Sequence, residues 1–299
     1  SKIEKYFKKN KIKNDVYYIP ENLRLGSSIK YFRNPDRFII GSRNKLKSKK
    51  ISKILSQFTK NLVWIETEAA ELTKHAINSF LANSISFINE LSYLSYSHKI
   101  DFSEVEVGLK TDLRIGGRAY LKPGMPFYGG TLERDLYFLK KITKKHGLKA
   151  PLFNAILTSN NNHKRWLIHI LKNLEKLIRF HDLAIWGIAY KKNTNTTRGS
   201  MIIDLIKNKY FNNFKINCFD PQIKSFNINK KNIIFFDKYE SSLPKSKVII
   251  IANDNDYFLE IFKKMNTKTL SRLIIIDYSR LAFAMKDKFY KYMTIGFSK

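Results

Sequence analysis

The chain has 299 residues and a hydrophobic fraction of 43%, which is enough apolar side chain for two compact domains. Its 55 Lys and Arg against 25 Asp and Glu give a formal net charge of +30, and its single cysteine, Cys218, excludes an internal disulfide and a multi-cysteine metal site. No apolar run is long enough to span a membrane and no signal segment opens the chain, so the cytoplasm is the expected location.

The positive charge is spread along the whole chain, mixed with Asn and Ile in stretches such as "KNKYFNNFKIN". An AT-rich coding sequence produces the same mixture, and a lysine cluster such as residues 44–50 is most often a solvated face. No signature of a nucleic-acid-binding module accompanies the charge, so nucleic acid is an unlikely partner. A positive field would still steer an anionic small substrate toward the protein.

The first part of the chain reads as short α/β elements. Residues 3–12 predict a basic helix, and "DVYYIP" (residues 15–20) and "DRFIIG" (residues 36–41) predict two short strands. These elements are the expected tail of an α/β unit whose beginning would lie before residue 1.

Residues 66–98 predict a long helix because they contain no Pro or Gly and repeat apolar side chains at helical spacing. The repeating apolar residues are Leu72, Ala76, Phe80, Phe87, Leu91 and Leu94. A helix of about thirty residues is about 45 Å long, enough to join two domains. Glu71, Lys74 and Asn78 form one polar stripe on it, which the spacing alone leaves open as an exposed face or part of a site.

The stretch "PGMPFYGGTLERDLYFL" (residues 123–139) places two glycines and a threonine before a predicted helix that ends near Gly147. Glycine lets backbone N–H groups approach a ligand closely, and a helix N-terminus attracts anions. The stretch therefore predicts a phosphorylated or oxyanionic ligand. Taken alone, Thr131 is best explained as the N-cap of the helix.

From residue 182 onward, short apolar runs alternate with helical segments, which predicts a doubly wound parallel sheet covered by helices on both faces. The runs are "LAIWGIAY", "KINCFDP", "NIIFF", "KVIIIAND" and "RLIIIDY". The chain has no G-x-G-x-x-G turn; "WGIAYKKNTNTTRGS" has one glycine at a strand end and then a polar loop with Lys191 and Arg198. That loop suits an anionic ligand better than a dinucleotide.

Four stretches in this order resemble the UDP-glucose and GDP-mannose dehydrogenases, which use NAD to oxidise the C6 alcohol of a nucleotide sugar to a carboxylate. They are "PENLRLGSSIKYFRNPDRFIIG", "ETEAAELTKHAINSFLANSISFINEL", "DLRIGGRAYLKPGMPFYGGTLERD" and "WGIAYKKNTNTTRGS" followed by "CFDP". The resemblance covers nearly all of the chain. It implies a remnant of the NAD-binding domain at residues 1–62, a central helical domain for dimerisation and substrate at 63–160, and a UDP-sugar-binding, Rossmann-like domain at 161–299.

The resemblance also implies the site residues. Glu21 matches the carboxylate that handles the hydrolytic water, and Lys74 and Asn78 match the pair that holds the reacting C6 oxygen. An ammonium and an amide one helical turn apart can share an oxyanion, so the polar stripe acquires a function. Residues 123–135 align without a gap to Pro-Gly-x-Gly-Phe-Gly-Gly-x-Cys-Leu-x-Arg/Lys-Asp, which places Thr131 at the catalytic cysteine and Asp135 at the last acid.

Two of the family's glycines are replaced in this stretch, by Pro126 and Tyr128, so the loop is expected to be stiffer and bulkier. Further positions match residues that bind the nucleotide sugar: Asn22, Leu23, Arg24, Arg114, Tyr120, Leu121, Lys122, Phe127, Gly129, Gly130, Lys191 and Arg280. Arg134 and Arg198 match positions near the cofactor, NAD. A homodimer through the central helix is the expected assembly.

Two functions follow from these residues. The first is an NAD-dependent nucleotide-sugar 6-dehydrogenase of the UDP-glucose type, serving polysaccharide synthesis, with Thr131 in place of the cysteine. The second is a non-catalytic, nucleotide-sugar-binding relic of that family. An in-frame glycine-rich βαβ unit encoded upstream of residue 1 would favour the enzyme, and a stop codon there would favour the relic.

Overall fold

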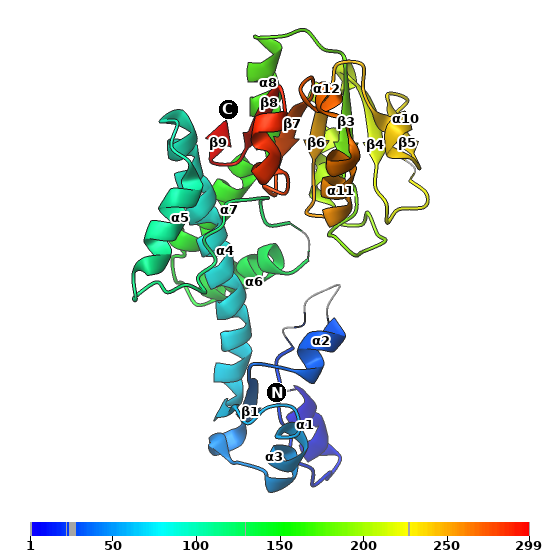
Figure 1. Cartoon of the computed structure of the whole chain (residues 1–299). Helices are drawn as coiled ribbons and strands as arrows, with labels where there is room; N and C mark the ends of the chain where they lie inside the picture. Colours follow the sequence, from blue (N-terminus) through cyan, green and yellow to red (C-terminus); the bar gives the residue numbers. More distant parts are fainter. Residues whose placement is uncertain (1, 22, 24–27, 129, 227, 299) are drawn as a thin grey trace. The chain divides into compact units, whose positions relative to one another are not determined.

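The computed structural model describes the chain except residues 1, 22, 24–27, 129, 227 and 299. The chain divides into two compact units, Ser1–Asn78 and Ser79–Lys299, and each is described by itself. Figure 1 shows the elements in chain order. Among the described residues, no helix has the length and apolar character needed to cross a membrane.

The first unit is built around two parallel strands, whose register runs from Phe38 opposite Leu62 to Ser42 opposite Glu66. The expected second strand is present, whereas residues 15–20 form only a single antiparallel bridge, in which Tyr18 exchanges backbone hydrogen bonds with Gly41 (2.9 and 2.7 Å). The expected basic helix ends early, at Lys9. The elements are α1 (Lys2–Lys9), α2 (Ser28–Arg33), β1 (Phe38–Ser42), η1 (Arg43–Lys45), α3 (Lys49–Leu55) and β2 (Leu62–Glu66).

Gly41 permits the close packing of β1 on the following helix. A Cβ atom at this position would lie 2.9 Å from the Cβ of Ala70 and 3.0 Å from the Cα of Thr67. Arg43, just after β1, pairs with Glu4 of α1 (Nε to Oε1, 2.6 Å) and also with Glu68. The small residue and the ion pairs therefore hold α1, β1 and the start of the long helix together.

The predicted long helix is confirmed as α4 (Thr67–Ser97), with 31 residues. The apolar residues that define its period are mostly exposed, including Phe80 (70%), Phe87 (55%) and Leu94 (58%). Its buried side chains in the second unit are largely small or polar, such as Ala82 and Asn89. The apolar periodicity thus marks a solvent-facing stripe and not only the core-facing side.

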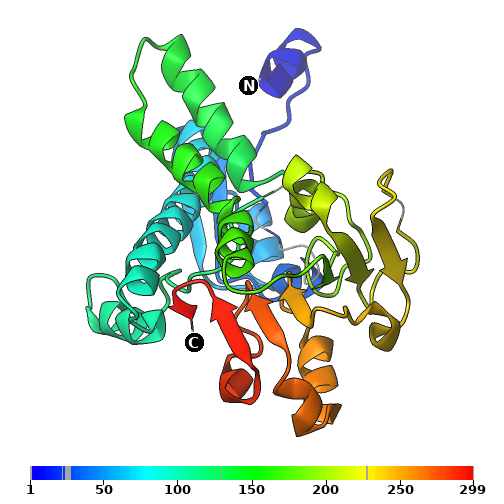
Figure 2. The same cartoon turned by 90° about the horizontal axis from the view of Figure 1, so that it is seen from above.

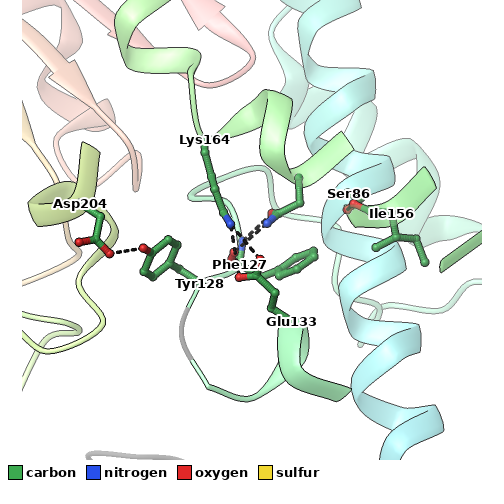
Figure 3. Close-up of polar contacts among 8 residues, drawn as sticks. Ser86, Phe127, Tyr128, Glu133, Ile156, Lys164 and Asp204 are labelled. Carbon is green, nitrogen blue, oxygen red and sulfur yellow. Dashed lines mark hydrogen bonds and ion pairs between the residues drawn. The ribbon is translucent and has the colours of Figure 1, made fainter. Parts of the chain in front are cut away.

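The helices that follow pack on α4 in the second unit. Ser86 of α4 donates a hydrogen bond to the carbonyl oxygen of Ile156 at 3.3 Å (Figure 3). A small core forms between these helices from Ala82, Phe127, Leu136, Ile156 and Leu157. The helices are α5 (Phe102–Thr111), α6 (Leu132–Lys145), α7 (Pro151–His163) and α8 (Trp166–Glu175).

The rest of the second unit is the predicted α/β domain. Its sheet has seven strands in the order β5-β4-β3-β6-β7-β8-β9, and all neighbouring pairs are parallel except β8 with β9. Figure 2 shows these strands side by side. The strands are β3 (Asp182–Trp186), β4 (Lys215–Phe219), β5 (Ile233–Phe236), β6 (Val248–Ile251), β7 (Ile274–Asp277), β8 (Lys291–Thr294) and β9 (Phe297–Ser298).

Alternate strand residues enter separate cores on the two faces of this sheet. Ile185 and Ile250 belong to the core that also contains α8, while Trp186 and Ile251 belong to the core that contains α11. From β3 the strand order runs to β4 and β5 on one side and to β6, β7, β8 and β9 on the other. The carboxyl ends of β3 and β6 therefore lie at a switch in strand order. The connecting helices are α9 (Met201–Ile206), η2 (Lys209–Asn213), α10 (Tyr239–Ser242), α11 (Asp256–Lys264), α12 (Thr267–Leu270) and η3 (Phe283–Lys288).

Candidate nucleotide-sugar site

The glycine loop, defined as residues 123–128, is held by side chains from two helices. The Gly124 N–H donates to Asn89 Oδ1 of α4 (2.9 Å), and the Gly124 carbonyl bonds to His163 Nε2 (2.8 Å). Asn160 accepts from the Phe127 N–H (2.9 Å) and donates to the Phe127 carbonyl (2.8 Å). Asn160 and His163 lie on one face of α7, because they are three residues apart in a helix. The backbone at Gly124 and Phe127 is therefore anchored without a ligand.

His163 is one of these anchors and is buried (2% exposed). Its Nδ1 lies 2.9 Å from the Tyr93 hydroxyl. Because the Gly124 carbonyl can only accept, Nε2 carries the proton, and Nδ1 accepts from the Tyr93 O–H. Burial lowers the pKa of His163 to about 4, so the imidazole is neutral near pH 7. It acts as a hydrogen-bonding anchor.

Tyr128 forms a second set of contacts, shown in Figure 3. Its hydroxyl donates to Asp204 Oδ2 of α9. Its ring lies under the Lys164 ammonium (4.9 Å to the ring centre), and the same ammonium is 3.2 Å from Glu133 Oε1. These contacts connect the glycine loop to α6, to the end of α7 and to α9.

Thr131 directly precedes α6, at the expected N-cap position, and is exposed. Its side chain makes no capping hydrogen bond, so the capping interpretation of this residue is wrong. Its carbonyl accepts the Asp135 N–H at 3.1 Å. Asp135 is fully buried and pairs with Arg134 (Nε to Oδ1, 3.2 Å), whose own side chain is 63% exposed. The hydroxyl of Thr131 is therefore available at the helix N-terminus.

The remaining predicted substrate residues around the glycine loop divide into exposed and buried groups. Tyr120, Lys122 and Gly130 are exposed, and Arg114 is exposed while paired with Asp112 (2.6 Å). Gly129 lies outside the described residues. The side chains of Leu121 and Phe127 lie in hydrophobic clusters. Those two side chains are core residues, and Asn160 already uses both backbone polar groups of Phe127.

The polar loop after β3, residues 190–200, is called the cation loop here. It closes on itself through a hydrogen bond from the Tyr190 N–H to the Thr196 carbonyl (2.8 Å) and a turn in which the Thr194 hydroxyl bonds the Lys191 backbone (2.7 and 3.2 Å). Lys191 and Arg198 are both exposed. The Lys191 ammonium lies 5.5 Å from the centre of the Tyr190 ring. Two exposed cations beyond the carboxyl end of a parallel strand are well placed for a diphosphate.

Arg280 behaves differently from those two cations. Its backbone has a φ of 59°, and its side chain is only 7% exposed. Nη2 donates to Asp101 Oδ1 (2.9 Å), and the guanidinium lies 3.9 Å from the centre of the Phe283 ring. Nη1 is buried and has no partner among the described residues. The arginine is thus held by Asp101, which directly precedes α5, and by Phe283 of η3.

Four predicted residues are described in the first unit. Glu21 is exposed and accepts a hydrogen bond from the Leu23 N–H, while Leu23 is 39% exposed. Lys74 and Asn78 lie one turn apart on α4, as expected, and Asn78 is buried (8% exposed). Asn22 and Arg24 lie outside the described residues.

The resemblance implies NAD, and the described glycines test whether the residues present would fit it. A Cβ atom would come within 3.0 Å of other atoms only at Gly41, Gly187 and Gly296 among the described glycines, and in each case those atoms belong to the protein. None of these positions is an open cradle for a pyrophosphate. Arg134 and Arg198 are exposed cations, but the described part of the chain does not by itself fit a dinucleotide.

Sequence reasoning did not identify the residues that hold the glycine loop. The other residues of α4 and α7 explain the helical pattern of these segments, and Asp204 lies in a short apolar helix. The residues missed are Asn89 of α4, Asn160 and His163 of α7, and Lys164 directly after α7. The available signal was a polar residue at a core-facing helix position. One shallow pocket of about 230 Å³ is lined by residues within 175–181 and 213–214, and another of about 360 Å³ by residues within 4–17 and 42–46. Among the described residues, no predicted site residue lines either pocket.

Comparison with known proteins relates this geometry to a family. Residues 68–162 match the central domain of the UDP-glucose/GDP-mannose dehydrogenase family, and residues 184–282 match its UDP binding domain. The UDP-glucose 6-dehydrogenase of Rickettsia bellii is 29% identical over 300 residues, covering 97% of this chain and 69% of the relative. TuaD, the UDP-glucose 6-dehydrogenase of Bacillus subtilis, is 27% identical, covering 91% of this chain and 59% of the relative.

The fold is similar to that of solved dehydrogenases. A UDP-glucose dehydrogenase from Pyrobaculum islandicum superposes with a TM-score of 0.80 at 22% identity, covering 95% of this chain and 64% of that one. A UDP-D-ManNAc dehydrogenase from Pyrococcus horikoshii gives a TM-score of 0.72 at 21% identity, covering 94% and 65%. The central domain and the UDP binding domain of the family are matched in order along the chain, and the fold is the same. This protein therefore belongs to the UDP-glucose/GDP-mannose dehydrogenase family.

Proposed function

We propose that this chain binds a UDP-sugar and forms the substrate-binding part of an NAD-dependent nucleotide-sugar 6-dehydrogenase. The cation loop carries the proposal: Lys191 and Arg198 are exposed beyond β3, inside the segment that matches the UDP binding domain. A diphosphate would pair with these cations through charge-assisted hydrogen bonds. The match at residues 68–162 supports a central substrate domain beside it.

The chemistry proposed for the first unit follows from Lys74, Asn78 and Glu21. The ammonium and the amide, one turn apart on α4, would stabilise negative charge on the C6 oxygen as it develops. The exposed Glu21 carboxylate would assist a water molecule in releasing the acid.

Thr131 favours a second candidate function, a nucleotide-sugar binder that does not complete the oxidation. Among the described residues, the Thr131 hydroxyl makes no hydrogen bond, so no base activates it. A cysteine has a pKa near 8.5 that a helix N-terminus can lower, whereas a threonine hydroxyl is far less acidic and needs an adjacent base. An oxygen ester is also less reactive toward water than a thioester. We therefore infer that the step in which residue 131 would hold the oxidised sugar as an ester, before water releases the acid, is slow or absent.

We also propose that a second copy of this chain covers the exposed stripe of α4. Phe80, Phe87 and Leu94 repeat every seven residues and are 55–70% exposed. Large apolar side chains in a continuous row are costly to leave in water and are typical of association surfaces. The proposed assembly is a homodimer.

Calorimetric titration with UDP-glucose and with UDP tests the binding function. Lys191→Ala should weaken the affinity about tenfold or more, the range for a hydrogen bond to a charged group, and the remaining affinity should fall as salt rises. Lys50→Ala, a matched change on exposed α3, should leave the affinity unchanged. Equal effects of the two changes would show that only diffuse charge is being measured, and no binding of either ligand would reject the proposal.

A further inference from the structure

Tyr128 joins the glycine loop to α9, a helix that lies far away in the sequence. Its hydroxyl donates to Asp204, 76 residues later, and its ring lies under the Lys164 ammonium. Asp204 is held in turn by Lys207 (Nζ to Oδ1, 2.6 Å), and Lys164 is held by Glu133 (3.2 Å). Figure 3 shows the tyrosine between the glycine loop and α9. Both the ring and the hydroxyl of Tyr128 are therefore fixed.

The residues on either side of this bond belong to the two halves of the candidate site. Asp204 lies in the first turn of α9, where its N–H bonds the carbonyl of Ser200, the last residue of the cation loop (3.3 Å). On the other side, the backbone just before Tyr128 is fixed by Asn160 and His163. The Tyr128–Asp204 bond thus connects a loop already anchored to α7 with the loop that carries Lys191 and Arg198.

We propose that Tyr128 and Asp204 are positioning residues that hold the glycine loop and the cation loop together as one preformed surface for the nucleotide sugar. This inference rests on the proposed UDP-sugar binding. Loops that are already ordered bind a ligand more tightly, because they lose less conformational entropy on binding. Since Tyr128 stands where the family pattern has a glycine, which has no side chain to donate, the contact is a feature of this chain and not of the pattern.

Hydrogen exchange measured by mass spectrometry tests the proposal on the full chain. The variants are Tyr128→Phe, Asp204→Leu and Asp204→Asn, with Tyr210→Phe as a matched control, because Tyr210 donates to Glu175 (2.7 Å) elsewhere in the same unit. Tyr128→Phe and Asp204→Leu should speed exchange at residues 124–128 and 190–204 and weaken UDP-glucose binding about tenfold. Asp204→Asn keeps an acceptor oxygen, so its exchange rates and UDP-glucose affinity should stay close to those of the unmodified chain. Tyr210→Phe should change neither the exchange at these residues nor the affinity.

The outcomes separate this inference from the function on which it rests. Unchanged exchange in Tyr128→Phe would overturn the positioning role. Equal losses in Asp204→Asn and Asp204→Leu would also overturn it, because both would then reflect damage to α9. If the unmodified chain does not bind UDP-glucose, the proposed function fails, and the exchange comparison still decides whether the bond holds the two loops together.

Discussion

Replacing Asn160 should be among the most destabilising single changes in the second unit. The side chain is 2% exposed and makes two hydrogen bonds to the Phe127 backbone, at 2.9 and 2.8 Å. Asn160→Ala leaves a buried N–H and a buried carbonyl without partners. Each of these two unsatisfied groups costs about 1–3 kcal/mol, so the free energy of unfolding should fall by about 2–6 kcal/mol. That is a large share of the typical 5–15 kcal/mol.

Urea denaturation followed by circular dichroism measures this change, with Asn162→Ala as the control, because Asn162 is an exposed residue of the same helix. The control should change the free energy of unfolding by less than about 0.5 kcal/mol. If Asn160→Ala and Asn162→Ala give the same value, Asn160 does not hold the glycine loop and the description of its backbone as fixed is incorrect.

Three further predictions concern pH, chemistry and assembly. The pKa of His163 is lowered to about 4, so the unfolded state binds more protons than the folded state between about pH 4 and 6.5. The free energy of unfolding should therefore decrease by up to about 3 kcal/mol as pH falls through that window. Urea denaturation at each pH measures this dependence, and His163→Gln should flatten it. Thr131→Cys should raise the rate of four-electron oxidation at least about a hundredfold. The assay is NADH formed per UDP-sugar consumed, in a protein able to bind NAD. Two NADH per sugar at an ordinary rate with Thr131 in place would contradict the assignment of Thr131 to the catalytic cysteine position. Phe87→Asp should shift the sedimentation coefficient from dimer to monomer, whereas Lys50→Asp should leave it unchanged, and a monomer before mutation would refute the proposed interface.

Local pattern determined much of the fold of this protein. The absence of Pro and Gly between residues 66 and 98, together with the helical spacing of apolar residues there, predicted α4. The apolar runs from residue 182 onward predicted the parallel strands, because helical and strand periods depend on neighbours within a few residues. The order of four motifs was enough to indicate the family. The short end strands β8 and β9 were not predicted, because "KYMTIGFS" (residues 291–298) contains no long run of apolar residues.

The tertiary structure decided how the candidate site is held together. Asn160 and Phe127 are 33 residues apart, Tyr128 and Asp204 are 76 apart, and Arg280 and Asp101 are 179 apart. Periodicity and capping rules act over a few residues, so they cannot indicate which distant polar groups will meet. For the same reason Thr131 looked like a capping residue although its hydroxyl caps nothing. Burial and hydrogen-bond partners depend on the packing of whole helices, and only the folded chain specifies that packing.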